Sequence, residues 1–106
     1  MDKQLKRGML DICVLAVLVG GDSYGYKIIQ DLNTVVSISE STLYPILRRL
    51  EESGAVRVYS VEHNGRLRKY YAITDIGNQK ITTFLDEWKS MMDIYAFIKG
   101  AVNENE

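Results

Sequence analysis

The chain has 106 residues but only one cysteine, one proline, one histidine and one tryptophan. With a single cysteine, Cys13, no intrachain disulfide is possible, and we expect this side chain to pack as a small apolar group in a reducing compartment. Long apolar runs are also absent: residues 12–19 form a run of eight, whereas a membrane-spanning helix needs about 20. Cations precede this run, as in a secretory signal, but Asp11 adjoins it. We therefore predict a buried helix in a cytoplasmic protein with no membrane partner.

The scarcity of histidine and cysteine also leaves little material for catalysis. His63 and Cys13 lie far apart in the sequence, no glycine-rich phosphate loop follows a predicted strand, and no pair of residues has metal-ligand spacing. We expect no enzymatic activity, no cofactor and no metal site. His63 is expected to be exposed beside a turn.

The composition that is present, 46% hydrophobic and 25% charged residues, is typical of one folded domain with a modest core. Apolar residues at helical spacing predict a first helix over residues 5–19, nearly apolar all round in its second half and therefore central in the fold. Asp22 or Ser23 is then expected to cap a second helix over residues 24–32.

A third helix lies within residues 37–54, and two residues compete for its start: Ser37, which fits a capping box with Glu40, and Ser39. Because Pro45 lacks an N–H and crowds the preceding turn, we expect a first turn that is 3₁₀-like or kinked. One face of this helix is apolar and consists of Leu43, Ile46, Leu47 and Leu50. The opposite face consists of Ser41, Tyr44, Pro45 and Arg48.

Two runs rich in valine, tyrosine and isoleucine, residues 55–62 and 67–73, predict a pair of antiparallel strands. Between them, Asn64-Gly65 favours a type I′ turn, because both central residues of that turn need φ > 0. Strand alternation assigns Tyr71 to the core. The two strands therefore form a hairpin.

A long last helix, capped by Thr74, completes a mainly helical α+β fold: a winged helix-turn-helix with a long C-terminal helix. The second and third helices form the helix-turn-helix, and the hairpin forms the wing. The predicted parts are a DNA-binding domain (residues 1–74), a dimerisation helix (residues 75–100) and a flexible tail (residues 101–106).

Two features indicate double-stranded DNA as the partner. The exposed face of the third helix carries hydroxyl and guanidinium donors, the groups that contact phosphates and base edges. The formal net charge is −1, yet residues 40–71 hold six cations against four anions, whereas residues 75–106 hold three against six. The predicted DNA-binding residues are Ser41, Thr42, Tyr44, Pro45, Arg48, Asn64, Gly65, Arg66, Arg68 and Lys69.

The last helix carries apolar residues at heptad spacing, the pattern of a helix–helix seam. Ile76 and Ile81 are expected to close the core of the monomer. Beyond them the seam predicts a homodimer that places two recognition helices about 34 Å apart on a palindromic site. The predicted interface residues are Phe84, Trp88, Met91, Tyr95 and Ile98.

Other readings stay open for several of these residues. Arg48 and Arg49 are also compatible with solvated charges paired with Glu51 or Glu52. The winged helix as a whole is compatible with a protein–protein interaction module that does not bind DNA. Trp88 and Met92, with Ile12 as a further wall, are compatible either with plain packing or with a ligand pocket.

The segment "STLYPILRRLEESG", with "YGYKI" before it and "GRLRKYYAITDIG" after it, resembles the PadR family of bacterial transcriptional regulators over residues 10–88. The resemblance implies a winged-helix homodimer, in most cases a repressor, that responds to small molecules or stress. The single C-terminal helix is similar to the smaller subfamily, which includes multidrug-responsive members. By position, Ser39 joins the DNA-reading helix, and Trp88 matches a tryptophan that stacks on planar ligands in a pore between subunits.

Two positions depart from the family pattern. Leu67 stands in the wing where many members have proline or a basic residue, which implies a wing tip that is either more flexible or less basic. Met92 stands where a drug-binding relative has an acidic residue, so an effector of this protein is expected to be planar and apolar rather than cationic.

Overall fold

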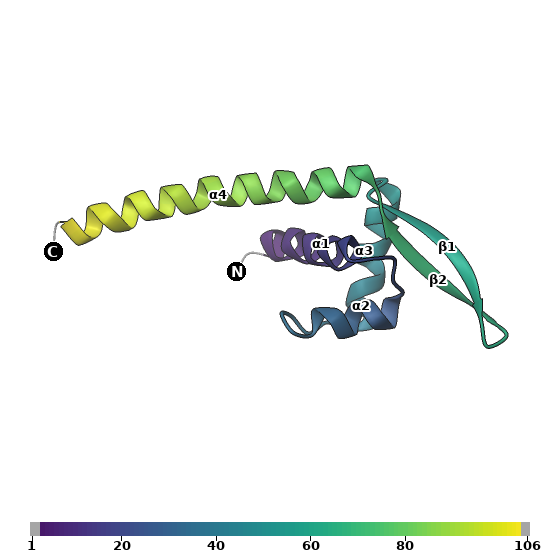
Figure 1. Ribbon diagram of the computed structural model, residues 1–106. Coiled ribbons are helices and arrows are strands. Elements are labelled where there is room, and N and C mark those ends of the chain that lie inside the picture. The colour runs from purple at the N-terminus through teal and green to yellow at the C-terminus, as the bar shows by residue number, and fades with distance from the viewer. Residues whose placement is uncertain (1–2, 105–106) are drawn as a thin grey trace.

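The computed structural model describes residues 3–104 of the chain. Three helices, a β-hairpin and a fourth helix follow one another, which confirms the predicted α+β, mainly helical winged helix-turn-helix (Figure 1). Helices α2 and α3 form the helix-turn-helix, and strands β1 and β2 form the wing. The bounds are α1 (Lys3–Val19), α2 (Gly25–Leu32), α3 (Glu40–Glu52), β1 (Val56–His63), β2 (Arg66–Ile73) and α4 (Asp75–Glu104).

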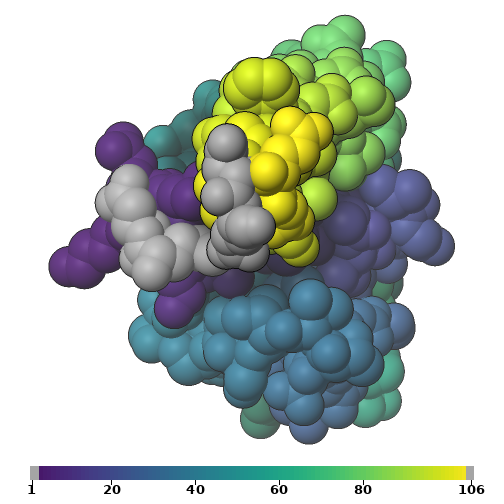
Figure 2. All heavy atoms as spheres, turned by 90° about the vertical axis from the view of Figure 1, so that its left-hand side faces the viewer, coloured from purple at the N-terminus to yellow at the C-terminus, as the bar shows by residue number. Residues whose placement is uncertain are grey.

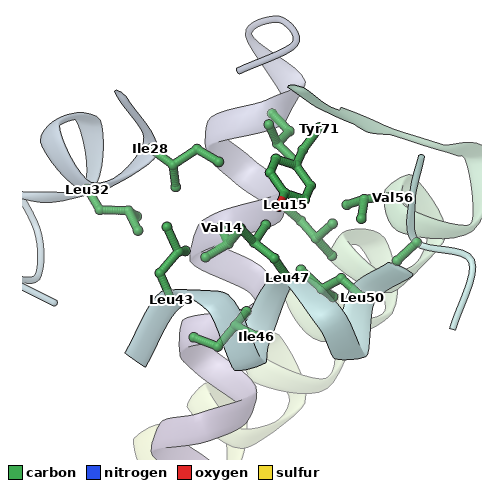
Figure 3. Packing of buried hydrophobic residues seen from close by; sticks show 12 residues of the cluster. Val14, Leu15, Ile28, Leu32, Leu43, Ile46, Leu47, Leu50, Val56 and Tyr71 are labelled. Atoms are coloured by element: carbon green, nitrogen blue, oxygen red, sulfur yellow. The ribbon is translucent and has the colours of Figure 1, made fainter. Parts of the chain in front are cut away.

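Helix α1 is central, as its apolar second half predicts. It contacts α2, α3, α4 and β2, and Val14, Leu15 and Leu18 are buried. Figure 3 shows the core side chains pointing toward one another from three helices and the base of the hairpin. The buried cluster includes Val14, Leu15, Leu18, Ile28, Leu32, Leu43, Ile46, Leu47, Leu50, Val56 and Tyr71.

The predicted caps of the second helix are wrong. Helix α2 follows Tyr24 as its N-cap residue, and no side chain caps it. Asp22 accepts a hydrogen bond from the Tyr59 hydroxyl (2.6 Å), and the backbone of Ser23 pairs with Tyr71 in both directions, at 3.1 and 2.7 Å. The loop after α1 thus extends along the edge of β2, and these bonds to the hairpin take the place of local capping.

Ser39 is the N-cap residue of helix α3, which begins at Glu40, so the alternative start at Ser37 is wrong. The Ser39 hydroxyl lies 2.8 Å from the Ser41 hydroxyl and 3.3 Å from that of Thr42, and it caps no backbone N–H. Of the expected 3₁₀-like or kinked first turn, a single 3₁₀-type bond is found: the Ser39 carbonyl accepts from the Thr42 N–H (3.1 Å) and also from the Leu43 N–H (3.0 Å), while the helix is α-helical from its first residue. Pro45 deprives only the Ser41 carbonyl of an amide donor, and because Ser41 is an exposed residue, water can compensate.

The wing has the predicted register and turn. The strands pair from Val56 with Ile73 to His63 with Arg66, and Asn64 and Gly65 have φ angles of 53° and 78°, as a type I′ turn requires. The hairpin is therefore a regular two-stranded ribbon that projects from the helical body (Figure 1).

The junction between the wing and α4 is tightly built. Thr74 accepts a hydrogen bond from the Gly77 N–H (3.2 Å), which confirms it as a cap, and its own hydroxyl donates to the Gly54 carbonyl. A Cβ atom at Gly77 would collide with the carbonyl oxygen of Ala55. Glycine at this position therefore lets the first turn of α4 start directly against the base of the hairpin.

Helix α4 is longer than predicted. It continues to Glu104, so most of the predicted flexible tail is helical, while residues 105–106 lie outside the described part of the chain. A lone helical glycine costs only about 1 kcal/mol, so Gly100 does not end the helix. Ile81 packs on the core as predicted, but Ile76 is exposed, contrary to expectation.

The protein is elongated because α4 extends past the N-terminal end of α1 (Figure 1). Its extents are 67 × 26 × 22 Å, and its radius of gyration is 17.2 Å. A compact domain of this length has a radius of about 13 Å. Figure 2 looks from the C-terminal end of α4, whose last turns stand in front of the winged helix.

Candidate nucleic-acid interface

The two faces of α3 divide as the sequence predicts. The apolar face lies in the core, where its four residues are at most 3% exposed. The predicted DNA-reading residues of this segment are all exposed: Ser39, Ser41, Thr42, Tyr44, Pro45 and Arg48. Hydroxyl and guanidinium donors thus reach solvent from a helix that the core holds firmly.

The two neighbouring arginines of α3 have different environments. Arg49 forms a half-buried ion pair with Asp11 of α1 at 2.7 Å, so for this residue the alternative of a solvated charge paired with Glu51 or Glu52 is wrong. Asp11 is 38 residues before Arg49 in the sequence, so the helical spacing of α3 could not predict this ion pair. Arg48 remains on the exposed face, available to a ligand.

Tyr44 leans over the first turn of α2. A Cβ atom at Gly25 would lie 2.7 Å from the Tyr44 hydroxyl oxygen, so any other residue there would displace the phenol ring from this position. Burial raises the pKa of Tyr71, and Tyr44 and Glu51 raise it further, so this phenol stays neutral and keeps its proton at physiological pH.

Together these residues form a groove between α2, α3 and the wing, which we call the tyrosine groove. Two of its lining residues are cationic and none carries a carboxylate, so it favours an anionic ligand. It brings three predicted site residues together, Tyr44, Arg68 and Lys69, from two elements. The full lining is Tyr24, Gly25, Tyr26, Tyr44, Arg68, Lys69 and Tyr71.

Sequence reasoning missed Tyr24, Gly25 and Tyr26 as parts of this site. They belong to the "YGYKI" segment, which marks the family resemblance but carries no charge before Lys27. Two tyrosines that flank a glycine at a helix start were the available signal. Only the fold places them beside the wing.

The tip of the wing is exposed, including Asn64, Gly65, Arg66 and His63. The exposure of His63 is as predicted. Leu67 is 77% exposed, an apolar side chain among cations. Asn64, Arg66 and Arg68 line a second hollow at the tip with His63 and Leu67.

The predicted ligand-pocket residues are not brought into one cavity. Ile12 lines one hollow between α1 and α4, and Trp88 lines a neighbouring one. Met92 lines neither of them and is half exposed. The Trp88 ring stacks on Phe84 at 6.1 Å between ring centres. The two hollows adjoin each other, because Gly8, Phe84 and Glu87 line both of them. Within one chain they therefore do not form a single pocket around Trp88.

Among residues 3–104, no cluster of histidine, cysteine, aspartate and glutamate could hold a metal ion. Over the same residues, no helix is both long enough and apolar enough to cross a lipid bilayer.

The order of elements, the exposed donor face of α3 and the basic wing define a winged helix-turn-helix protein. Residues 14–83 match the transcriptional regulator PadR-like family. The chain belongs to this family, whose members are DNA-binding transcription factors rather than enzymes.

Three relatives illustrate the similarity. An uncharacterized protein of Lysinibacillus sphaericus is 34% identical, over 89% of this chain and 92% of its own length. A PadR-like transcription factor of Bacteroides fragilis has 32% identity and a TM-score of 0.82, over 90% of this chain and 94% of its own. Bacillus subtilis PadR, solved in complex with operator DNA, has 26% identity and a TM-score of 0.65, over 72% of this chain and 46% of its own.

Proposed function

We propose that the protein is a sequence-specific transcriptional regulator that binds a palindromic operator as a homodimer and acts as a repressor. The observation that carries this proposal is the common exposure of Arg48 on α3 and of the cations on the wing, with the tyrosine groove between them. Helix α3 enters the major groove, and the wing contacts the adjacent backbone or minor groove. The solved complex of B. subtilis PadR with operator DNA supports the proposal that the chain binds double-stranded DNA.

We propose the homodimer because helix α4 has an exposed apolar surface that a second copy of the chain would cover. Six large apolar residues on or beside the heptad seam of its last turns are half or more exposed: Met91, Met92, Ile94, Tyr95, Ile98 and Val102. Such a patch is unusual on a monomeric protein. Residues 75–100 therefore serve as the dimerisation helix, and residues 1–74 as the DNA-binding domain. The interface includes Phe84 and Trp88, which are already half-buried against α1.

Replacing Arg48 with alanine tests the sequence-reading role of α3. We expect the R48A variant to lose about 1–3 kcal/mol of discrimination between a site selected from a random duplex library and a scrambled duplex, because a base-edge contact is lost. The measurement is fluorescence anisotropy on both duplexes. The matched control is K89A, which removes an exposed cation of α4. Equal discrimination in R48A and K89A would contradict the assignment.

We further propose that a planar apolar effector binds between the two subunits near Trp88 and releases the operator. The chain has one tryptophan, so its emission reports on this site alone. Titrating the dimer with planar aromatic compounds is expected to quench this emission by more than half, because a stacked ring contacts the indole directly. The W88F variant supplies the background signal. Unchanged emission with a whole panel, in protein verified as dimeric, would count against the effector site.

A further inference from the structure

A column of aromatic rings links the wing to the loop before α2. The Tyr59 and Tyr70 rings stack with centres 5.7 Å apart, and Tyr24 meets Tyr70 edge-on at 5.5 Å. Each end of the column carries a guanidinium group. Arg57 lies 5.4 Å from the centre of the Tyr59 ring, and Arg68 lies 4.1 Å from the centre of the Tyr24 ring.

The column is tied to the body of the protein at two points. The Tyr59 hydroxyl donates to the Asp22 carboxylate at 2.6 Å, which also raises the pKa of this phenol. Ser23, the residue before Tyr24, is paired through its backbone with the backbone of Tyr71. These bonds hold Tyr24 in a set position relative to β2, so its ring is a rigid platform for a side chain of the wing.

Arg68 gains a defined position from this platform. A free arginine side chain samples many rotamers, and ordering it on binding costs affinity. Stacking on a ring face restricts the guanidinium plane but leaves its N–H groups, which point outward in that plane, free to bind an anion. Arg68 lines the tyrosine groove together with Lys69, and the side chains of Tyr26 and Tyr44 line the same groove.

We propose that the tyrosine groove binds one phosphate of the DNA backbone and that Tyr24 is the positioning residue that holds Arg68 ready for it. This inference rests on the proposed function, because it assigns a further part of the same interface. Arg68 makes a bidentate contact to the phosphate, Lys69 adds a second charge, and Tyr24 itself acts through Arg68 alone.

The test is a double-mutant cycle on the full-length protein, with anisotropy on a labelled duplex that carries the selected site. Y24L is expected to weaken binding three- to tenfold, since a cation–π contact of ordinary strength is lost. Y24F keeps the ring and is expected to bind like the wild type. In an R68A background, Y24L is expected to have no further effect, because the group that Tyr24 positions is gone.

Melting temperatures of every variant separate positioning from folding. R68K is the second test variant, for use if Y24L does not fold. It keeps the positive charge and changes no core residue, but it removes the planar guanidinium group from the Tyr24 ring. We expect R68K to weaken DNA binding as Y24L does. Three outcomes would each overturn the inference while leaving DNA binding intact. The first is that Y24L or R68K binds like the wild type, and the second is that Y24F loses as much affinity as Y24L. The third is that Y24L weakens binding in the R68A background as much as it does in the wild type. If the wild type binds no duplex, the proposed function itself fails.

Discussion

We expect the DNA affinity of the protein to fall about 10³-fold when salt is raised from 50 to 200 mM. Apart from Arg48, which is proposed to read a base edge, each subunit exposes Arg66 and Lys69 to the DNA backbone, and it holds Arg68 half-exposed over Tyr24. A dimer would then place six cations against the phosphate backbone, and the released counterions give a slope of about −5 in log affinity against log salt concentration. Anisotropy titrations at four or more salt concentrations measure this slope.

Replacing Lys69 with alanine is expected to make that slope shallower by about 2 for the dimer, because each subunit loses one phosphate contact. Affinity should fall for the selected site and for a scrambled duplex alike. K89A is again the control, since Lys89 lies in α4 and pairs with Asp93 at the surface. A wild type whose DNA binding is weak and independent of salt would favour the alternative of a winged helix that contacts an acidic protein.

We expect an aspartate in place of Tyr95 to dissociate the dimer. Tyr95 is 58% exposed in the single chain and lies on the apolar seam of α4, where a twofold interface would cover it. A buried charge without a partner costs about 3–5 kcal/mol. Because the substitution enters twice, once from each subunit, the dimer is expected to weaken by roughly 10⁴–10⁷-fold. Sedimentation velocity at micromolar concentration measures the oligomeric state.

The matched control is F97D, two residues further along the same helix. Phe97 is 77% exposed and points to the other side of α4, about 200° around from Tyr95. F97D introduces the same charge at another exposed aromatic position of the same helix, and we expect this variant to remain dimeric. If Y95D stays dimeric as well, or if F97D alone dissociates, the seam of α4 that contains Tyr95 is not the dimer interface.

Patterns within single elements were sufficient for most of the fold. The two faces of α3, the type I′ turn at Asn64-Gly65 and the Thr74 cap were all predictable. In each case the cause is local: a helical period, a φ requirement or a hydrogen bond between residues three positions apart. Errors arose where local groups bonded to distant ones, as with Asp22, Ser23 and Arg49.

The sequence by itself determined the order of elements, the exposed polar face of the third helix and the basic wing, because periodicity and turn chemistry act over a few residues. Only the tertiary structure decided that Tyr24 lies under Arg68, that Tyr44 covers Gly25 and that Arg49 binds Asp11. These contacts join residues 19 to 44 positions apart in the sequence. Their geometry depends on how the helices and the hairpin pack around one core, which no short segment specifies.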